Sequence, residues 1–485
     1  MTRSDSAVPV FAVVGHPNKG KSSLVATLAQ DDRVAIAPDP GTTTKATRFP
    51  MRVDGETLYE LVDTPGFQRA RSVLAWLQEE ADRTNASAAD RHALVARFVE
   101  ASAHRSRFPD EVELLEPIVA GAGILYVVDG SVPYGAEYEA EMEVLRWTGR
   151  PSFAVINPIG TADHVDAWRS ALGQYFRAVR VFDAVDADFD KRLDLLRAFG
   201  ELDERFRDAL RRAIDVLGAD RAARRRRAAI EIASLLAEAT TLVVEKRIGL
   251  DERAEDHRAA LEADFRSRLR RLERRERSAV ESIYDFHDLD VQEGEALEDD
   301  TARALLAEDL FDRDTWLVFG LRGRDLVTAG AAAGAAAGGP LDLALGGASF
   351  LAGAAVGSVV GGALGWWGSD RLGRLEVMRQ PIGGALVRYG PAKSTNFVAV
   401  LLGRACLHAE LVARRAHARR DRLALSATGS AIVRDAGARP SGAAEERGEP
   451  KKLDARQLKP VIDALTQPEG PEQATLASAV ERLLE

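Results

Sequence analysis

A short segment near the start of the chain has the residue types and the spacing needed to hold a phosphate group. It reads Gly15-His16-Pro17-Asn18-Lys19-Gly20-Lys21-Ser22 and fits the pattern Gly-x-x-x-x-Gly-Lys-Ser. An apolar run at 8–14 precedes it and a helical pattern at 22–29 follows, which is the strand, loop and helix context that the motif requires. Glycine lets backbone wrap a phosphate without Cβ clashes, and the helix N-terminus adds free N–H donors.

This segment predicts a binding loop for a nucleoside triphosphate. In such a loop Lys21 reaches the β- and γ-phosphates, and the Ser22 hydroxyl ligates Mg²⁺. The residues predicted to contact the nucleotide here are Asn18, Lys19, Gly20, Lys21, Ser22 and Ser23.

Two further motifs follow in the order that a nucleotide switch needs. Asp63-Thr64-Pro65-Gly66 ends the apolar run 58–62, where the Asp63 carboxylate can hold Mg²⁺ through water and the Gly66 N–H can meet the γ-phosphate. Between the motifs stands Pro40-Gly41-Thr42-Thr43-Thr44, whose threonine can close over Mg²⁺ and release when the γ-phosphate leaves. The motifs predict Lys21, Thr43 and Gly66 as catalytic residues, and Ser22, Thr43 and Asp63 as metal ligands.

The segments GHPNKGKSSL, PGTTT and DTPG resemble the Era/TrmE branch of translation-factor-type GTPases over roughly residues 8–186. The resemblance implies GTP and GDP as ligands and Mg²⁺ as cofactor. It also implies Thr43 as the switch I threonine, with Thr42 or Thr44 as alternatives, and places Asp63 and Gly66 in switch II. In that branch the asparagine matching Asn18 helps to hold a potassium ion that assists hydrolysis, so K⁺ is a hypothesis here. The resemblance also suggests a homodimer formed through the GTPase domain.

The base-reading motif departs from that family. The branch has Asn-Lys-x-Asp, in which the aspartate pairs with guanine, whereas this chain has Asn157-Pro158-Ile159-Gly160 after the apolar run 153–156. Asn157 stays a predicted base contact. Asp163 or Asp166 could replace the aspartate, although the spacing does not fit a simple replacement. Preference for guanine therefore rests on the resemblance, and an ATPase is the alternative.

The residue after Gly66 is the second departure. Small signalling GTPases place a glutamine there to orient the attacking water, and this chain has Phe67, which cannot do so. Gln68 stands one residue late. We expect slow hydrolysis unless a cation, another loop or a partner positions the water, and a nucleotide-binding scaffold with little turnover is the alternative.

The fold class follows from alternating strand and helix signals. Apolar runs suited to buried strands occur at 8–14, 58–62, 124–128, 153–156 and 178–182. Helical patterns separate most of them, which predicts a mostly parallel sheet with helices on both faces over residues 1–186. An insertion at 68–118 is expected to form two polar helices, Arg71–Arg83 and Ala88–Ser106. The insertion, with Arg97, Arg105 and Arg107 among its charges, is read either as solvated surface or as an effector surface that moves with switch II.

Beyond residue 186 the chain is predicted to be mainly helical. Residues 187–325 have lost strand signals and carry much charge, including Arg224–Arg227 and a mixed-charge run over Asp251–Glu281. Four apolar residues recur there at helical spacing, namely Leu261, Phe265, Leu269 and Leu272. A helical bundle with a charged outer face is favoured over a nucleic-acid site. Further divisions are a helical continuation at 369–426, a linker at 427–455, and a helix at 456–485 that docks a partner or its own body.

Residues 326–368 are an Ala/Gly-rich segment with one charged side chain, Asp342. Glycines recur every four residues, at Gly330, Gly334 and Gly338 and then at Gly353, Gly357, Gly361 and Gly365. This spacing places small residues on one helical face, as in a glycine zipper. The second arm, Leu343–Trp367, exceeds the roughly 20 residues of a membrane span, and arginines flank both ends. We expect a helical hairpin that associates with a membrane; a hairpin packed inside a soluble domain is the alternative.

Composition sets the outer limits of the interpretation. The 485 residues suggest two or three domains, and 46% apolar with 29% charged residues describes a globular protein. The net charge of -10 gives no specific nucleic-acid signal and speaks against a soluble GTPase of ribosome or RNA assembly, the remaining alternative. One cysteine, Cys406, fits a reducing compartment, and the N-terminal residues contain no apolar signal core. We expect a cytoplasmic protein, peripheral to or hairpin-inserted at the inner face of the cell membrane.

The resemblance extends in outline to the whole chain. Some bacterial GTPases of this branch carry a C-terminal helical domain of uncharacterised function with an Ala/Gly-rich segment, and this chain is similar to them, including its Asn157-Pro158-Ile159-Gly160 departure. The expected protein is a bacterial-type GTP-hydrolysing switch whose nucleotide state controls a helical, membrane-associating region.

Overall fold

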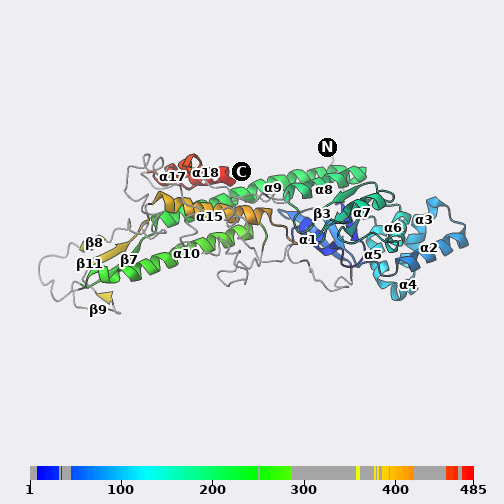
Figure 1. Ribbon diagram of the computed structural model, residues 1–485, viewed down its shortest axis with the longest axis horizontal. Helices are drawn as coiled ribbons and strands as arrows, with labels where there is room; N and C mark the ends of the chain where they lie inside the picture. The colour runs from blue at the N-terminus through cyan, green and yellow to red at the C-terminus, as the bar shows by residue number, and fades with distance from the viewer. Residues whose placement is uncertain are drawn as a thin grey trace, which may run out of the picture. The chain divides into compact units, whose positions relative to one another are not determined.

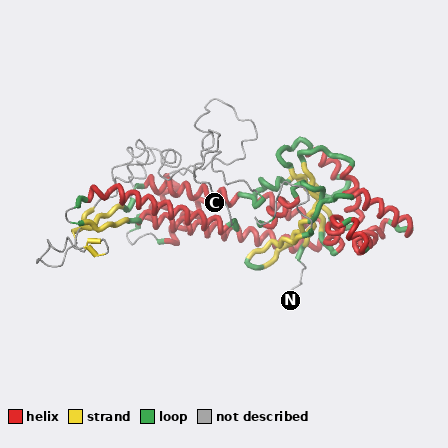
Figure 2. Tube along the Cα trace, turned by 90° about the horizontal axis from the view of Figure 1, so that it is seen from below, coloured by secondary structure: helices red, strands yellow, loops and turns green. Residues whose placement is uncertain are grey.

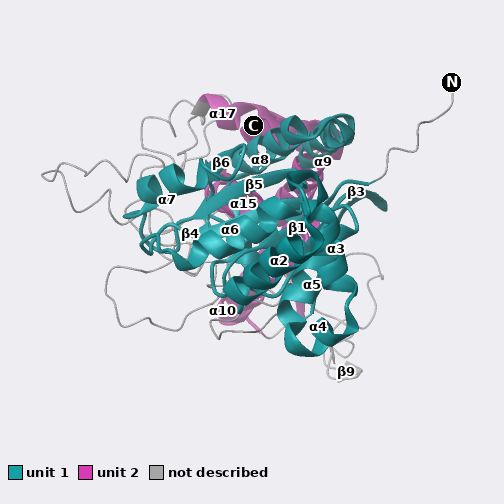
Figure 3. Cartoon of the chain, turned by 90° about the vertical axis from the view of Figure 1, so that its right-hand side faces the viewer, with its two compact units in different colours: residues 1–222, 414–420 teal, residues 223–413, 421–485 magenta. Residues whose placement is uncertain are grey.

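The computed structural model of the chain divides into two compact units (Figure 3). Unit 1 comprises Met1–Ala222 and Arg414–Arg420, and unit 2 comprises Ala223–Ala413 and Asp421–Glu485. The residues that the structure describes are 8–31, 34, 45–249, 252–286, 357–360, 376–377, 380–381, 385–392, 394–418, 455–467 and 472–484.

Unit 1 contains a six-stranded sheet in the order β2-β3-β1-β4-β5-β6. Figure 1 labels β3 of this sheet. Its strands are β1 (Val10–Val14), β2 (Thr47–Val53), β3 (Glu56–Asp63), β4 (Gly123–Asp129), β5 (Ser152–Asn157) and β6 (Val179–Val181). All neighbours pair in parallel except β2 and β3, which are antiparallel. The predicted mostly parallel sheet is confirmed. The sequence analysis missed β2, because Pro50 and two arginines interrupt its apolar pattern, which an edge strand tolerates.

Helices cover both faces of this sheet. Phe11 and Val13 of β1 lie in one buried cluster with α1 (Lys21–Ala29) and α8 (Phe189–Leu202). Ala12 and Val14 lie in another cluster on the opposite face. The helices contributing to that second cluster are α2 (Ala70–Thr84), α3 (Arg91–Glu100), α5 (Pro109–Val119), α6 (Glu137–Trp147) and α7 (Val165–Leu172). Because successive strand residues point to opposite faces, a strand covered twice must be apolar throughout.

The first unit extends past residue 186, where the sequence analysis placed the end of its first domain. Helix α8 belongs to unit 1, because Phe199 stacks on Phe11 with ring centroids 4.7 Å apart and meets Phe153 edge-on at 5.0 Å. A segment far along the chain joins the same unit, since Ala418 is buried in this core.

The insertion after switch II has more helices than expected. Helix α2 matches the first predicted helix closely, whereas the second is divided into a 3-10 turn (Ala88–Asp90), α3 and α4 (Ser102–Arg107), and α5 follows. The backbone leaves the helical region at Ala101 (φ -68°, ψ 115°), which separates α3 from α4. Pro109 starts α5, at a position where its missing N–H costs nothing.

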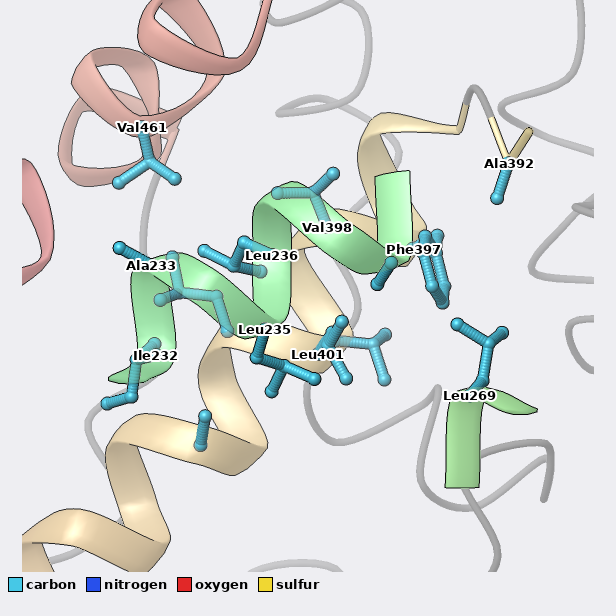
Figure 4. Close-up of a cluster of buried hydrophobic side chains, with 14 of the residues drawn as sticks. Ile232, Ala233, Leu235, Leu236, Leu269, Ala392, Phe397, Val398, Leu401 and Val461 are labelled. Atoms are coloured by element: carbon cyan, nitrogen blue, oxygen red, sulfur yellow. The ribbon is translucent and has the colours of Figure 1, made fainter. Parts of the chain in front are cut away.

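Unit 2 is mainly helical, as predicted (Figure 2). Its helices are the second part of α9 (Glu204–Thr241), a 3-10 turn (Ala254–His257), α10 (Arg258–Ile283), α15 (Thr395–Arg414, up to Ala413), α17 (Ala455–Leu465) and α18 (Gln473–Leu484). Leu261, Phe265 and Leu269 of α10 are buried in one core with residues of the other four helices. Figure 4 shows part of this core, where Val461 of α17 points toward Ala233 and Leu236 of α9. The predicted apolar stripe therefore packs inside a helical bundle, and the C-terminal helices dock on their own body.

Strands are also present in unit 2, contrary to the expectation that residues 188–326 contain none. Strand β7 (Val244–Ile248) pairs antiparallel with β11 (Ala385–Tyr389), and β11 pairs antiparallel with β8 (Gly357–Val360). Two short strands, β9 (Glu376–Val377) and β10 (Gln380–Pro381), form a separate pair. Charged residues fill the middle of β7, so its local pattern is not that of a strand; its pairing partner lies far along the chain.

The predicted Ala/Gly-rich hairpin lies mostly outside the described residues. Only 357–360 are described within 326–368, and they form strand β8 where we expected helix. The pair Val359 and Val360 suits a strand, because β-branched residues fit a pleated sheet. The predicted linker at 427–455 also falls outside the described residues, apart from Ala455. Among the described helices one, α15, is long and apolar enough to cross a bilayer, but 67% of its apolar window is buried, as in a core helix.

Candidate nucleotide-binding site

The loop between β1 and α1 has a backbone that requires glycine at both ends. Gly15 has φ +144°, and a Cβ on it would lie 2.4 Å from the carbonyl oxygen of Val127. Gly20 has φ +80°, and a Cβ there would lie 2.1 Å from Nδ2 of Asn157. Both positions therefore exclude a side chain, sterically and through their backbone angles. The loop passes close against β4 and β5, which brings the predicted phosphate-binding residues to the carboxyl end of the sheet.

Lys21, the first residue of α1, is a buried cation. Its side chain is 7% exposed, and Nζ donates a hydrogen bond to the carbonyl oxygen of His16 at 2.9 Å. Burial lowers the pKa of Lys21 to about 8, although the carboxylates of Asp63 and Glu141 act in the opposite direction. A buried ammonium held mainly by a neutral carbonyl is a favourable place for an anion.

Ser22 and Asp63 come together directly beside this lysine. The Ser22 hydroxyl donates to Oδ2 of Asp63 at 2.7 Å, and Asp63 is 3% exposed. The register of the sheet places them there, since Asp63 at the end of β3 pairs with Val13 of β1. A hydroxyl and a carboxylate are hard oxygen donors, so this pair fits Mg²⁺. The third predicted metal ligand, Thr43, lies outside the described residues, as do Thr42 and Thr44.

The backbone of switch II packs closely against the phosphate-binding loop. A Cβ on Gly66 would lie 2.6 Å from the backbone nitrogen of Pro17, so only glycine fits this approach. The Phe67 N–H donates to the carbonyl oxygen of Gly15 at 3.2 Å, and the Phe67 side chain is 1% exposed. Phe67 thus turns into the core below switch II, and Gln68 is exposed.

Asn157 connects three segments at the other side of the site. Its Nδ2 donates to the carbonyl oxygen of Lys19 at 3.4 Å, and its Oδ1 accepts from the N–H of Ala184 at 3.1 Å. Lys19 also approaches Asp129, with Nζ 3.8 Å from Oδ2. Both ends of the Asn157 amide bind backbone, and its predicted contact with the base stays a prediction.

The other candidates for reading a base lie at the surface. Asp163 is exposed, and Asp166 forms an ion pair with Arg169 of the same helix at 3.0 Å. The structure therefore gives Asp163 and Asp166 no contact with Asn157 among the hydrogen bonds of the described residues.

Comparison with known proteins places both parts of the chain. Residues 169–475, more than half of its length, match the family described as "Domain of unknown function (DUF3482)". The chain belongs to this DUF3482 family. Residues 10–157 match the family described as "50S ribosome-binding GTPase", which together with the fold makes unit 1 of this DUF3482 protein a P-loop GTPase domain of the Era type, as the sequence predicted.

Curated relatives of the DUF3482 protein include GTPase Der from two bacteria. That of Mycoplasma pneumoniae is 48% identical over 59 residues, 12% of this chain and 13% of the relative. That of Lactobacillus helveticus is 34% identical over 119 residues, 24% of this chain and 27% of the relative. The matched segments thus span at most about a quarter of these relatives' length.

Solved structures that are similar to part of the chain include two of Era. A crystal structure of Era in complex with MgGDPNP and nucleotides 1506-1542 of 16S ribosomal RNA is 18% identical and covers 36% of this chain and 51% of Era. A single-substitution variant of Aquifex aeolicus Era bound to GDP.AlF4- is 19% identical over the same shares of the two chains. Their TM-scores are 0.27 and 0.23, too low for either structure to carry an argument about this chain.

Sequence analysis missed several residues of the GTPase domain that lie at this site. Nδ1 of His16 lies 2.8 Å from Oε1 of Glu141, whose Oε2 accepts from the Tyr126 hydroxyl at 2.8 Å. Glu141 is 2% exposed. Burial, together with the Glu141 charge, raises the pKa of Tyr126 well above its usual value. An acidic residue on the apolar face of α6 was the available signal, because a carboxylate buried there must have polar partners.

Proposed function

We propose that unit 1 of the DUF3482 protein binds GTP and GDP, hydrolyses GTP, and thereby controls the helical unit 2. Buried Lys21 is the observation that carries this proposal. It stands at the start of α1 with a lowered pKa, in a loop whose glycines admit no side chain. An anion with several negative oxygens suits this environment, and the helix N-terminus adds N–H donors.

Different residues of unit 1 are proposed to bind the phosphates, the Mg²⁺ ion and the base. Lys21 and the N–H groups of 18–23 hold the phosphates, Gly66 offers its N–H to the γ-phosphate, and Ser22, Asp63 and Thr43 hold Mg²⁺. When bound, Mg²⁺ neutralises charge that develops on the phosphate oxygens. Asn157 keeps the phosphate-binding loop in register with β5 and contacts the base.

Calorimetric titration with Mg²⁺-GTP, Mg²⁺-GDP and Mg²⁺-ATP tests the proposal. We expect the wild-type protein to bind both guanine nucleotides and the Lys21→Ala variant to lose at least about a hundredfold in affinity, as for loss of a charged contact. Lys191→Ala, which removes an exposed lysine of α8, is the matched control and should bind as wild type. Equal or tighter binding of ATP would make the protein an ATPase and overturn the assignment of guanine.

Hydrolysis should be slow, because Phe67 is buried and Gln68 faces solvent. Asn18, which has φ +60° in the loop, is proposed to help hold a K⁺ ion that assists the reaction. Turnover measured in potassium and in sodium buffers tests this point. Equal rates in the two buffers would exclude a role for K⁺ in hydrolysis. No measurable rate in either buffer would favour a nucleotide-binding scaffold without turnover.

We further propose that residues 326–368 bring the protein to the inner face of the cell membrane. Flotation of the full chain with anionic lipid vesicles should carry wild type, and Val356→Lys should reduce the floated fraction, because a charge at mid-segment opposes insertion. Wild type that stays at the bottom of the gradient would contradict membrane association. We also propose that the protein forms a homodimer through its GTPase domain, and light scattering of the protein without vesicles tests this by its molar mass.

A ribosomal partner is the second candidate. It is favoured by the description "50S ribosome-binding GTPase" for residues 10–157, while the net charge of -10 opposes it. Sedimentation with ribosomal subunits at low and high salt, with GDPNP and with GDP, distinguishes a ribosomal partner from membrane association. Nucleotide-dependent, salt-sensitive co-sedimentation would replace the membrane proposal.

A further inference from the structure

A buried carboxylate from the insertion holds the backbone at the exit of switch II. Glu111 lies on α5 and is 1% exposed. Its Oε1 accepts from the N–H of Gln68 at 3.0 Å and from the N–H of Arg69 at 2.5 Å. These two N–H groups come directly after Phe67 and directly before α2, so Glu111 binds the junction between switch II and the insertion.

One of these two bonds satisfies the backbone N–H of Arg69, the residue directly before α2. Arg69, the residue before α2, makes no capping hydrogen bond with its side chain, and the first N–H groups of a helix have no partner within it. A negative charge at this end is favourable, and charge-assisted hydrogen bonds offset the cost of burying the carboxylate. Arg69 is held a second time, because its guanidinium donates to the carbonyl oxygen of Arg107 at 2.7 Å.

The same helix also reaches the segment that follows switch I. Oε2 of Glu113 accepts from the N–H of Ala46 at 3.1 Å, and Ala46 immediately precedes β2. Residues two apart on a helix do not share a face, which agrees with two carboxylates that bind two different segments. Helix α5 is therefore bonded to the backbone beyond both switches.

Switch II is held between this helix and the phosphate-binding loop. On one side the Phe67 N–H bonds to Gly15 and Gly66 presses on Pro17. On the other side, one residue on, Glu111 holds Gln68 and Arg69. In the proposed function the Gly66 N–H meets the γ-phosphate, which a diphosphate lacks, so a shift of Gly66 on binding of a triphosphate would act on the bonds of Glu111.

We propose that Glu111 and Glu113 form a latch, the α5 latch, through which the insertion 68–118 senses the nucleotide state. Glu111 is a positioning residue: it keeps Gly66 against the phosphate-binding loop, where its N–H can meet the γ-phosphate, and couples movement there to α2. Glu113 acts in the same way on the entry to β2. This inference rests on the proposed GTP-binding function and adds a route by which that site moves an effector surface.

The test compares affinities for Mg²⁺-GDPNP and Mg²⁺-GDP by calorimetry in the full chain. Glu111→Ala should lower the affinity for GDPNP about tenfold relative to GDP, as expected for hydrogen bonds to a charged group. Glu111→Gln keeps an acceptor oxygen and should lose only about threefold, and so should Glu113→Ala. Glu116→Ala, on the exposed side of α5 where Glu116 pairs with Arg105, is the control and should match wild type.

A change of the GDPNP-to-GDP ratio separates the latch from a merely structural cap. If Glu111→Ala weakens both nucleotides equally, or neither, the latch is overturned. Wild type that binds neither nucleotide overturns the proposed function instead, which is a different result.

A fluorescence measurement on wild type gives a second test, which does not depend on the stability of the Glu111 variants. Trp76 lies on α2, with its ring 5.3 Å from Phe98 and 4.8 Å from His104 of the insertion. Replacing GDP by GDPNP should change the emission of wild type, and Trp76→Phe should abolish that difference. Identical emission spectra with the two nucleotides would overturn the movement of α2.

Discussion

Both units bury ionisable side chains, but they do so in different surroundings. In unit 1, Lys21 and Asp63 lie at the carboxyl end of a parallel sheet, where loops meet. In unit 2, Oε1 of Glu273 on α10 accepts from Nε of Arg404 at 2.7 Å and from Arg277 at 2.8 Å, between packed helices. The charges of unit 2 neutralise one another within the bundle, whereas Lys21 is hydrogen-bonded to a carbonyl.

Glu276 shows that a shifted pKa alone does not identify a ligand site. Burial raises its pKa to about 8, the same value to which burial lowers the pKa of Lys21. Glu276 is 2% exposed, and neither carboxylate oxygen has a hydrogen-bond partner among the described residues. The glycine loop, the neighbouring Ser22 and the edge of the sheet distinguish Lys21, and Glu276 in mid-helix has none of these. The comparison therefore predicts ligand binding at Lys21 and a stability effect at Glu276.

The largest effect is expected from breaking the buried pair in unit 2. Arg404→Met should lower the free energy of unfolding by about 3 kcal/mol, because Glu273 then keeps only part of its compensation. Chemical denaturation measures this loss, and nucleotide affinity should stay unchanged. Arg275→Met, which removes an exposed partner of Glu238, is the control and should have little effect. A large loss of nucleotide affinity in Arg404→Met would contradict the assignment of ligand binding to unit 1 and of a purely stabilising role to the buried pair in unit 2.

Glu276 should make unit 2 sensitive to pH. Its folded-state pKa is about 8 and the ordinary value is 4.5, so the folded state binds more protons between these pH values. The stability contributed by protonated Glu276 is complete below pH 4.5 and is lost as the pH rises through 8. Wild type should lose roughly 3 kcal/mol of stability between pH 5 and 8 through this group, and Glu276→Gln should not show that loss.

Denaturation of wild type and Glu276→Gln across this range checks the prediction. Carboxylates Glu273, Glu231 and Glu281 also act on Glu276, and Arg277 opposes them. Parallel pH profiles for the two proteins would show that Glu276 is ionised with little cost in the fold.

A smaller loss of stability is expected on changing Thr27, which contacts the distant segment 414–420 within unit 1. The hydroxyl of Thr27 on α1 donates to the carbonyl oxygen of Ala184 at 2.6 Å and accepts from the N–H of Ala418 at 3.4 Å. Thr27→Val keeps the shape and removes both bonds, so unit 1 should lose about 1 kcal/mol of stability. Thr241→Val, at an exposed position of α9, provides the comparison by thermal unfolding. Equal melting temperatures for both variants would mean that the Thr27 bonds contribute nothing.

The smallest effect is a proton taken up with the nucleotide. At pH 8 about half of the Lys21 side chains are neutral before binding, and bound phosphate should hold the proton. Calorimetry with Mg²⁺-GDP in two buffers of different ionisation enthalpy should show uptake of about half a proton at pH 8, falling toward zero below pH 7. The corresponding loss of affinity at pH 8 is only about twofold. If the Lys21→Ala variant, which binds weakly, still takes up a proton with the nucleotide, the proton belongs to another group.

Local pattern was enough for most of unit 1. The strands β1, β3, β4 and β5 stood out because burial on both faces demands continuous apolar runs. The edge strand β6 is half-buried or exposed and was found from the run at 178–182. Strand β2 did not, because an edge strand carries Pro50 and arginines, and β7 did not, because its partner β11 is distant in the chain. The same limit applied to Glu111 and Glu141, which read as ordinary helix charges until their partners at 68–69 and at His16 are in place.

The sequence by itself determined the phosphate-binding loop, Asp63 and Gly66, because their chemistry depends on residue types at short spacing next to a strand and a helix. It also determined the mainly helical character of unit 2. Only the tertiary structure decided that Phe67 turns inward, that both ends of the Asn157 amide bind backbone, and that Glu111 binds the exit of switch II. These contacts join residues dozens of positions apart, and no local periodicity records which side chain a folded chain brings to a given backbone N–H.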